Sequence, residues 1–129
     1  MKKLLPIFFT AVFGLCFNYI NQITTFDEEG VYWLDPDRNN VKKSDLNGNN
    51  ITLVQNGLTA PARIALDLIN NKMYWTDSNT DKIQRADLDG ANVEDLIIDG
   101  LTIPNSIALD IAGGKMYWTD NGTHEIKRA

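Results

Sequence analysis

A hexapeptide that occurs twice constrains this chain more than any other feature. Residues 72–77 and 115–120 both have the sequence Lys-Met-Tyr-Trp-Thr-Asp, and residues 31–35 carry a looser copy, Val-Tyr-Trp-Leu-Asp. The tyrosines of successive copies are 42 and 43 residues apart. A period of this length in strand-forming sequence indicates a stacked array of β-sheets, as in a β-propeller. The motif residues that we single out are Tyr32, Trp33, Asp35, Tyr74, Trp75, Asp77, Tyr117, Trp118 and Asp120.

Short apolar segments separated by turn residues mark the strands of the repeat. We expect the strands of the second repeat at 61–67, 73–76, 82–88 and 93–98, and matching segments of the first at 41–48 and 51–54. The pair Asn70-Asn71 is replaced by Gly113-Gly114 in the third repeat. Both pairs tolerate positive φ, which a two-residue type I′ hairpin requires at both positions. The sequence therefore predicts two-residue hairpins at these pairs and a further turn at Asp89-Gly90.

The distribution of apolar residues favours sheets that are covered on both sides. In Met73-Tyr74-Trp75 the side chains that point to either face of the strand are apolar, as in a strand buried on both faces. The outer strand at 82–86 alternates apolar and polar residues, as an element near solvent does. This gradient is typical of a sheet stacked between two others. We predict an all-β fold of β-propeller blades, each a four-stranded antiparallel meander, with about three blades in the chain.

The N-terminus has the plan of a secretory signal peptide. Two lysines follow Met1, and an uncharged apolar run then extends to Phe17. We assign residues 1–20 to a signal peptide, with an uncleaved membrane anchor or a buried first strand as the alternatives. Cys16 lies in this run. A bacterial lipid-attachment cysteine usually follows a small residue, whereas Leu15 precedes this one, so we do not favour lipidation. The expected location is secreted and extracellular, or periplasmic or cell-surface in a bacterium, with membrane contact only if the segment stays uncleaved.

Composition excludes several function classes. The formal net charge is −5, and the repeats contain no block of Lys or Arg, so we expect no nucleic-acid partner. One His and one Cys rule out most metal and nucleophile constellations, and no catalytic triad can be built, so we expect no enzyme and no cofactor. A calcium loop beginning at Asp87 fails because Ala91 and Val93 stand where ligands should fall. We expect His124 to be an exposed loop residue.

The motifs in their fixed order carry a family resemblance. Tyr-Trp-Thr-Asp, followed by Lys-Ile-Gln-Arg-Ala-Asp-Leu-Asp-Gly and by Gly-Leu-Thr-Ile-Pro-Asn-Ser-Ile-Ala-Leu-Asp, resembles the class B (YWTD) repeat of the low-density lipoprotein receptor family. The resemblance covers residues 29–129 and implies a six-bladed propeller on extracellular, receptor-like proteins that binds proteins and does no chemistry. It also implies that Asp35, Asp77 and Asp120 belong to a hydrogen-bond pattern that joins blade to blade.

The chain departs from the family pattern in number and in detail. Leu34 replaces the threonine of the motif, and only three motifs are present. We divide residues 21–129 into repeats at approximately 29–57, 58–100 and 101–129, an incomplete six-bladed propeller whose third blade lacks a fourth strand. We expect either a fragment of a longer propeller, which we favour, or self-association of two chains into one ring. In the second case residues 20–27 of one chain supply the strand that the other lacks.

Three further residues are candidates for ligand binding or modification. Six-bladed propellers also include metal-dependent lactonases, whose Pro-Asn-Gly-like segment resembles Pro104-Asn105-Ser106, and that alternative would make Asn105 a metal ligand. The sequences Asn50-Ile51-Thr52 and Asn121-Gly122-Thr123 fit the N-glycosylation pattern, although turn-forming Asn is expected at both places. We weigh the enzyme below a protein-binding module, because fold analogy alone says little about function.

Overall fold

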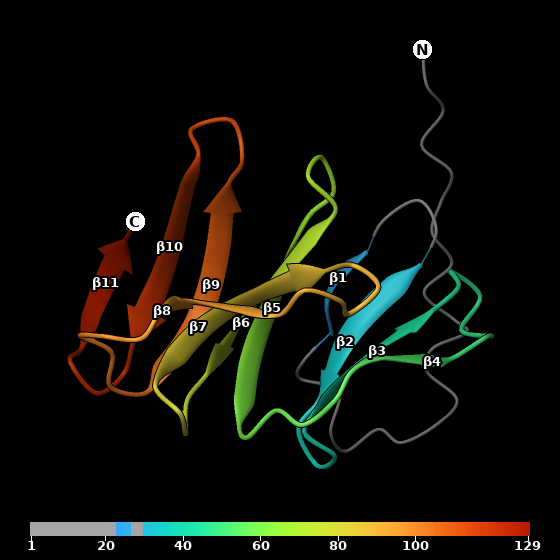
Figure 1. Cartoon of the computed structure of the whole chain (residues 1–129), viewed down its shortest axis with the longest axis horizontal. Coiled ribbons are helices and arrows are strands. Elements are labelled where there is room, and N and C mark those ends of the chain that lie inside the picture. The colour runs from blue at the N-terminus through green and yellow to red at the C-terminus, as the bar shows by residue number, and fades with distance from the viewer. Residues whose placement is uncertain (1–22, 27–29) are drawn as a thin grey trace.

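The computed structural model describes residues 23–26 and 30–129, and these residues form strands joined by turns, with no helix (Figure 1). The strands make three antiparallel sheets that follow one another along the chain as blades 1, 2 and 3. The prediction of an all-β fold of propeller blades is confirmed. The predicted signal segment, 1–20, and Cys16 lie outside the described residues. Within the part of the chain that the structure describes, no helix is long and apolar enough to cross a membrane.

Each blade is a meander in which neighbouring strands are also neighbours in sequence. Blade 1 contains β1 (Ile23–Phe26), β2 (Val31–Asp35), β3 (Asn40–Ser44) and β4 (Thr52–Gln55). Blade 2 contains β5 (Pro61–Asp67), β6 (Lys72–Asp77), β7 (Lys82–Asp87) and β8 (Glu94–Ile97). Blade 3 contains β9 (Pro104–Asp110), β10 (Lys115–Asp120) and β11 (Glu125–Arg128). The repeated hexapeptide therefore forms the second strand of its blade.

Most predicted strands are found, with shifted ends. The predicted strand at 61–67 matches β5, whereas β6 is one residue longer at each end than the predicted 73–76. β7 and β8 are slightly shorter than predicted, and β4 begins and ends one residue later. The largest difference lies in the segment 41–48, which matches the third strand and the Asp-Gly turn of the second repeat: β3 already ends at Ser44. The Asp45 carboxylate accepts the backbone N–H groups of Asn47 and Asn49, and this turn stops the strand.

The prediction of two-residue type I′ hairpins is wrong. Four residues separate β5 from β6, and only the last of them, Asn71, has positive φ, at 54°. The same holds between β9 and β10, where Gly114 has a φ of 62° and Gly113 is not left-handed. The Asp67 carboxylate accepts the N–H groups of Ile69 and Asn70, so the side chain of the last strand residue shapes the turn. The turn at Asp89-Gly90 is confirmed, with Gly90 at a φ of 90°.

The N-terminal strand β1 belongs to its own blade. It pairs antiparallel with β2, with Ile23 opposite Trp33 and Phe26 opposite Val31. In this sheet β1 holds the position that β5 and β9 hold in theirs. The expectation that residues 20–27 supply a strand to a second chain is therefore wrong for the strand-forming part of that segment.

Two apolar cores hold the blades together. Between blades 1 and 2, Leu34 and Val41 pack with Ile64, Met73, Trp75 and Ala86. Between blades 2 and 3, Ile83 packs with Leu101, Met116 and Trp118, and Tyr74 lies against this cluster. Met73 and Trp75 thus face one neighbour while Tyr74 faces the other. This confirms the prediction that the motif strand is covered on both sides, because each blade buries its faces only against its neighbours.

Candidate functional site

The aspartate that ends the second motif lies where two blades join. Asp77 is 1% exposed, and its carboxylate accepts the N–H groups of Thr59 and Ala60 in the segment that leads from blade 1 to blade 2. It also accepts the N–H groups of Asn79 and Thr80 in its own turn. Burial raises the pKa of Asp77, but the four N–H donors lower it by more than burial raises it, so its pKa lies below the ordinary 3.8. The carboxylate therefore stays ionised although it is buried.

The other two motif aspartates have related surroundings. Asp120 is 1% exposed and accepts the N–H group of Thr102 in the next connecting segment. Burial raises the pKa of Asp120, but the N–H groups of Thr102 and Thr123 and the Lys127 ammonium outweigh that effect and leave it below the ordinary value. Asp35 accepts the Lys42 ammonium at 2.6 Å and the guanidinium of Arg38 at 3.1 Å. Burial raises the pKa of Asp35, and the two cations outweigh that effect. Asp35 is only partly buried and its partners lie in its own blade, whereas the buried carboxylates of Asp77 and Asp120 bond N–H groups of the connecting segments.

The threonine of the motif forms a second bridge between blades. The buried Thr76 hydroxyl donates to the backbone carbonyl of Asn105 in β9 at 2.5 Å and accepts the N–H group of Arg63. At the first joint Leu34 stands in the place of Thr76 and packs into the apolar core instead. The carbonyl of Ala62, which corresponds to that of Asn105, is then bonded by the guanidinium of Arg63 at 2.8 Å. The arginine replaces the hydroxyl that Leu34 lacks.

The motif tryptophans differ in their polar contacts. Trp75 is fully buried, and its indole N–H donates to the Gln84 side chain at 3.1 Å. Lys127 replaces the glutamine opposite Trp118 and bonds to the Gly100 carbonyl and to Asp120 instead. The buried indole N–H of Trp118 has no acceptor among the described residues. Trp33 is only half-buried.

The motif tyrosines each lie opposite a basic residue on the third strand. Lys43 lies 4.7 Å from the ring centre of Tyr32, and Arg85 lies 5.8 Å from that of Tyr74. Tyr117 is paired with Arg128 in the same register. A cation over an aromatic face adds a modest attraction, so this pair helps to hold the second and third strands together.

Blade 3 exposes the face that the other blades bury. Ile126 is 79% exposed, whereas Ile83 and Val41, which hold the same position in blades 2 and 1, are 0% exposed. Thr119 corresponds to Thr76 but donates to no carbonyl within residues 30–129. We call Tyr117, Thr119 and Ile126 the open face. Its composition is that of a buried surface between two blades.

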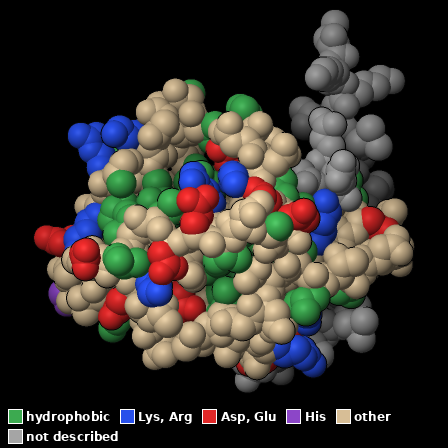
Figure 2. All heavy atoms as spheres, viewed as in Figure 1, with side chains coloured by type: hydrophobic (Ala, Val, Ile, Leu, Met, Phe, Trp, Pro, Cys, Tyr) green, Lys and Arg blue, Asp and Glu red, His purple; other side chains and the backbone are tan. Residues whose placement is uncertain are grey.

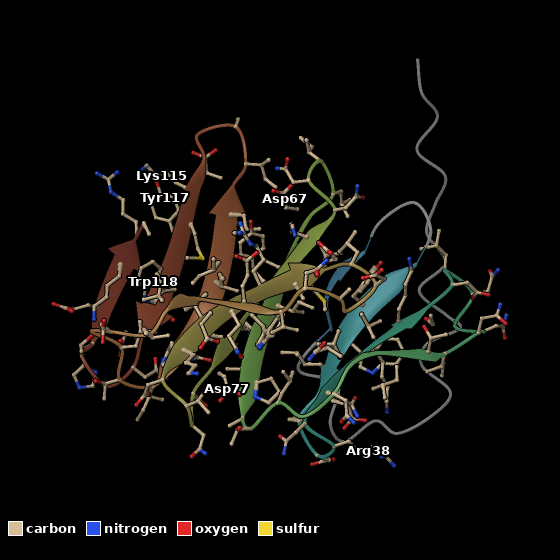
Figure 3. The ribbon with its side chains drawn as sticks, viewed as in Figure 1. Arg38, Asp67, Asp77, Lys115, Tyr117 and Trp118 are labelled. Carbon is tan, nitrogen blue, oxygen red and sulfur yellow. The ribbon has the colours of Figure 1, made fainter. Side chains whose placement is uncertain are left out.

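One end of the strands carries exposed apolar side chains. Antiparallel strands alternate in direction, so Asp67 and Asp77 lie at opposite ends of blade 2 (Figure 3). The turns at the Asp67 end include five large apolar residues that are 45% to 79% exposed, and we call them the apolar rim: Leu46, Ile51, Leu68, Ile69 and Val93. The N–H of Leu88 donates to the carbonyl of Asn71, which ties two of these turns together. Sequence reasoning missed this surface, although Leu68-Ile69 inside a polar turn is its visible signal.

Charges of both signs are mixed over the face shown in Figure 2. Blade 2 contains three cross-strand ion pairs: Lys72 with Asp87, Lys82 with Asp95, and Arg85 with Glu94. A mixed surface of this kind produces no extended field of one sign.

The remaining predicted residues lie apart from one another. Asn50 is exposed and its side-chain nitrogen donates to Asp45, and Asn121 is exposed at the start of the β10–β11 turn. Asn105 is half-buried in β9 and uses its backbone carbonyl to bind Thr76. His124 is exposed in a turn. Among the described residues, no three His, Cys, Asp or Glu side chains are grouped so that they could hold a metal ion.

Comparison with known proteins identifies the repeat. Residues 71–111 match the family model described as low-density lipoprotein receptor repeat class B. The chain carries the class B repeat. This match confirms the family resemblance found in the sequence, and it spans β6 to β8 of blade 2 and β9 of blade 3. One class B repeat therefore reaches across two blades and links them covalently.

Solved structures show the same architecture. The structure of a nidogen/laminin complex matches with 32% identity and a TM-score of 0.76, covering 84% of this chain and 42% of the other. A virginiamycin B lyase from Staphylococcus aureus matches with 19% identity and a TM-score of 0.67, covering 82% of this chain and 36% of the other. The chain thus spans less than half the length of either protein. The search of curated proteins gave no match.

Proposed function

We propose that this chain is a secreted or cell-surface protein-interaction module that does no chemistry. The observation that carries the proposal is the class B repeat together with the 32% identity to nidogen. That nidogen structure is a complex with laminin, so a related blade array takes part in a protein complex. The N-terminus, two lysines followed by an uncharged apolar run, supports export, and Asn50 and Asn121 are glycosylation sites under this proposal.

We propose the apolar rim as the surface that contacts the protein ligand. Binding residues are concentrated on loops that a rigid scaffold positions, and the rim lies on the turns of blades 1 and 2. Exposed Leu, Ile and Val side chains lose unfavourable contact with water when a partner covers them. Exposed apolar patches can mark interaction sites on soluble proteins.

A binding assay with matched variants tests this function. The purified chain is immobilised and exposed to laminin and then to a panel of other extracellular-matrix proteins. We expect at least one to bind, and Ile69→Asp to weaken that binding about tenfold or more, as loss of a central contact does. Leu53→Asp is the matched control, because Leu53 is 56% exposed but lies on β4 outside the rim. Absence of binding to the whole panel, or equal loss in both variants, would contradict the proposal.

We also propose that a further class B blade of the same protein covers the open face of blade 3. The support is the contrast between Ile126 and its buried equivalents, and the 42% share of the nidogen chain that this chain spans. The blade is supplied either by a longer form of the chain, which we favour, or by a second copy through self-association. A surface that is buried twice within this chain is complementary to another blade of the same kind.

The metal-dependent lactonase is the alternative that this proposal sets aside. The likeness to the lyase concerns the fold, and Asn105 is engaged through its backbone in the joint between blades. We expect Ca²⁺ and Zn²⁺ to leave the melting temperature unchanged. A metal that binds only the folded state would raise it, and such a rise that Asn105→Ala abolishes would favour the enzyme.

A further inference from the structure

The chain contains three Asn-Gly pairs: Asn47-Gly48, Asn56-Gly57 and Asn121-Gly122. In such a pair the backbone nitrogen of glycine can attack the side-chain amide carbon of asparagine. A C–N bond forms, ammonia leaves, and the ring product is a succinimide. Water then opens the ring to give either aspartate or isoaspartate. Glycine favours the attack because it has no side chain to obstruct the required backbone rotation. Whether a given pair reacts depends on where the folded chain holds that nitrogen.

Two of the three nitrogens are held away from the asparagine side chain. The N–H of Gly48 donates to the backbone carbonyl of Asp45 at 3.0 Å. The N–H of Gly122 donates to the carbonyl of Thr102 at 2.7 Å and to the Asp120 carboxylate at 3.1 Å. Each nitrogen would have to give up these bonds before it could turn toward the neighbouring amide, so the fold protects both pairs.

The third nitrogen is held against the group that it would attack. The N–H of Gly57 donates to the side-chain oxygen of Asn56 at 2.8 Å. The amide carbon lies one C=O bond, about 1.23 Å, from that oxygen, so the nitrogen lies within about 4 Å of the carbon that it would attack. Both residues are exposed, and the site of a glycine Cβ at Gly57 has no atom within 4 Å, so nothing obstructs the ring or the entry of water.

We propose that Asn56-Gly57 is a site of spontaneous succinimide formation, and that it is the reactive one of the three pairs. The reaction needs only the chain and water. Its products replace the neutral Asn56 side chain by a carboxylate, either in a normal backbone or in a backbone lengthened by one methylene group.

The position of the pair gives the two products different consequences. Asn56-Gly57 lies between blades 1 and 2, directly before Leu58 and Thr59, whose N–H groups bond to the Asn39 carbonyl and the Asp77 carboxylate. The next joint has Asp99-Gly100 at the same place, and Gly100 has a φ of 69° against 76° for Gly57. The aspartate product therefore suits this joint. The isoaspartate product displaces Leu58 and Thr59 from their acceptors and loosens the joint.

Peptide mass spectrometry of the folded chain after incubation in mildly alkaline buffer tests the proposal. We expect Asn56 to convert to the acid at least about tenfold faster than Asn47 and Asn121, because only its nitrogen is pre-positioned. In concentrated urea the three rates should converge, which shows that the fold and not the dipeptide sets the order. Equal rates in the folded chain, or a faster rate at Asn121, would overturn the proposal.

Variants separate the chemistry from its effect on the joint. Asn56→Gln should suppress the conversion, because the longer side chain does not form the same ring. Asn56→Asp should melt close to the parent chain, as Asp99 occupies the equivalent place. The aged protein should melt lower in proportion to its isoaspartate content. An aged sample that is rich in isoaspartate and melts like Asn56→Asp would contradict the loosening of the joint.

Discussion

Asp77 and Asp120 are buried carboxylates whose charge is kept by the backbone donors around them. Burial raises their pKa, and the N–H groups of the connecting segments and turns lower it below the ordinary 3.8. A carboxyl group with a lowered pKa in the folded state stabilises that state above its unfolded pKa. The stabilisation is lost as pH falls through the folded pKa. Acid should therefore weaken the joints between blades.

We expect the free energy of unfolding to decrease as pH falls below about 3.8. Asp77→Asn should lower it by about 1–3 kcal/mol at neutral pH, because several buried N–H groups lose a charged acceptor. The same variant should reduce the acid dependence, since one of the titrating groups is gone. Urea denaturation over a pH series measures both effects. Asp99→Asn, an exposed position in the other connecting segment, is the control and should change neither; an unaltered acid slope in Asp77→Asn would refute this account.

Trp75 and Trp118 are the same residue type at the same place in neighbouring blades, but only Trp75 has an acceptor for its indole N–H. Trp75→Phe removes a satisfied hydrogen bond and leaves Gln84 without that donor. Trp118→Phe removes a buried donor that has no partner in the described chain. We expect Trp75→Phe to cost about 1 kcal/mol more than Trp118→Phe, as measured by chemical denaturation. Equal losses would show that the indole of Trp118 finds an acceptor in solution.

At the scale of the element, the motif strand β6 carries the contacts that join three blades. Met73 and Trp75 lie in the core shared with blade 1, while Tyr74 and Thr76 contact blade 3. The strand is therefore both the second strand of its sheet and part of two interfaces. Its apolar residues therefore stabilise the packing between blades as well as the sheet of blade 2.

Trp75→Ala should cost about 3–5 kcal/mol, as large aromatic truncations in packed cores do. Against a total stability of about 5–15 kcal/mol, that loss can unfold the module. Thermal denaturation followed by circular dichroism measures it. Ile69→Ala is the control, because this side chain is 79% exposed and surface changes of that kind stay within about 0.5 kcal/mol. A Trp75→Ala variant that melts with the parent chain would place Trp75 at the surface.

At the scale of the whole molecule, the described residues form three blades in an array, and one face of blade 3 is open. Each joint buries an apolar cluster, and a motif aspartate accepts N–H groups of the connecting segment, so the array is stabilised joint by joint. On the described chain the open face has no such partner. An exposed blade face and the free edge of β11 both favour association.

Light scattering should give a mass above that of one chain at micromolar concentration. Ile126→Glu should shift the mass toward the monomer, because it places a charge at the centre of the contact. A mass of two chains indicates that a second copy covers the face, and larger soluble assemblies indicate that a continuation of the protein normally does. A monomeric parent chain, or association that ignores Ile126→Glu, would contradict the role given to the open face. Ile103→Glu is the control, because Ile103 is an isoleucine outside the face that is 48% exposed.

The sequence by itself determined the fold class, the repeat and the family, because periodicity and residue type are properties of the chain alone. The hexapeptide predicted the second strand of each blade, and apolar residues of both parities in Met73-Tyr74-Trp75 predicted burial on both faces. The turn at Asp89-Gly90 followed from glycine's tolerance of positive φ. These signals depend only on residues close together in the sequence, so they can be interpreted without the tertiary structure.

Only the tertiary structure decided what depends on the distance between residues far apart in the chain. The Thr76 hydroxyl donates to the carbonyl of Asn105, which lies 29 residues further along the chain, and Lys127 donates to the carbonyl of Gly100, 27 residues back. Equivalent positions also diverge, since Ile83 is buried and Ile126 is exposed although the two occupy the same place in the repeat. Burial of this position depends on the presence of a neighbouring blade, and the sequence around the residue does not show whether such a blade packs against it.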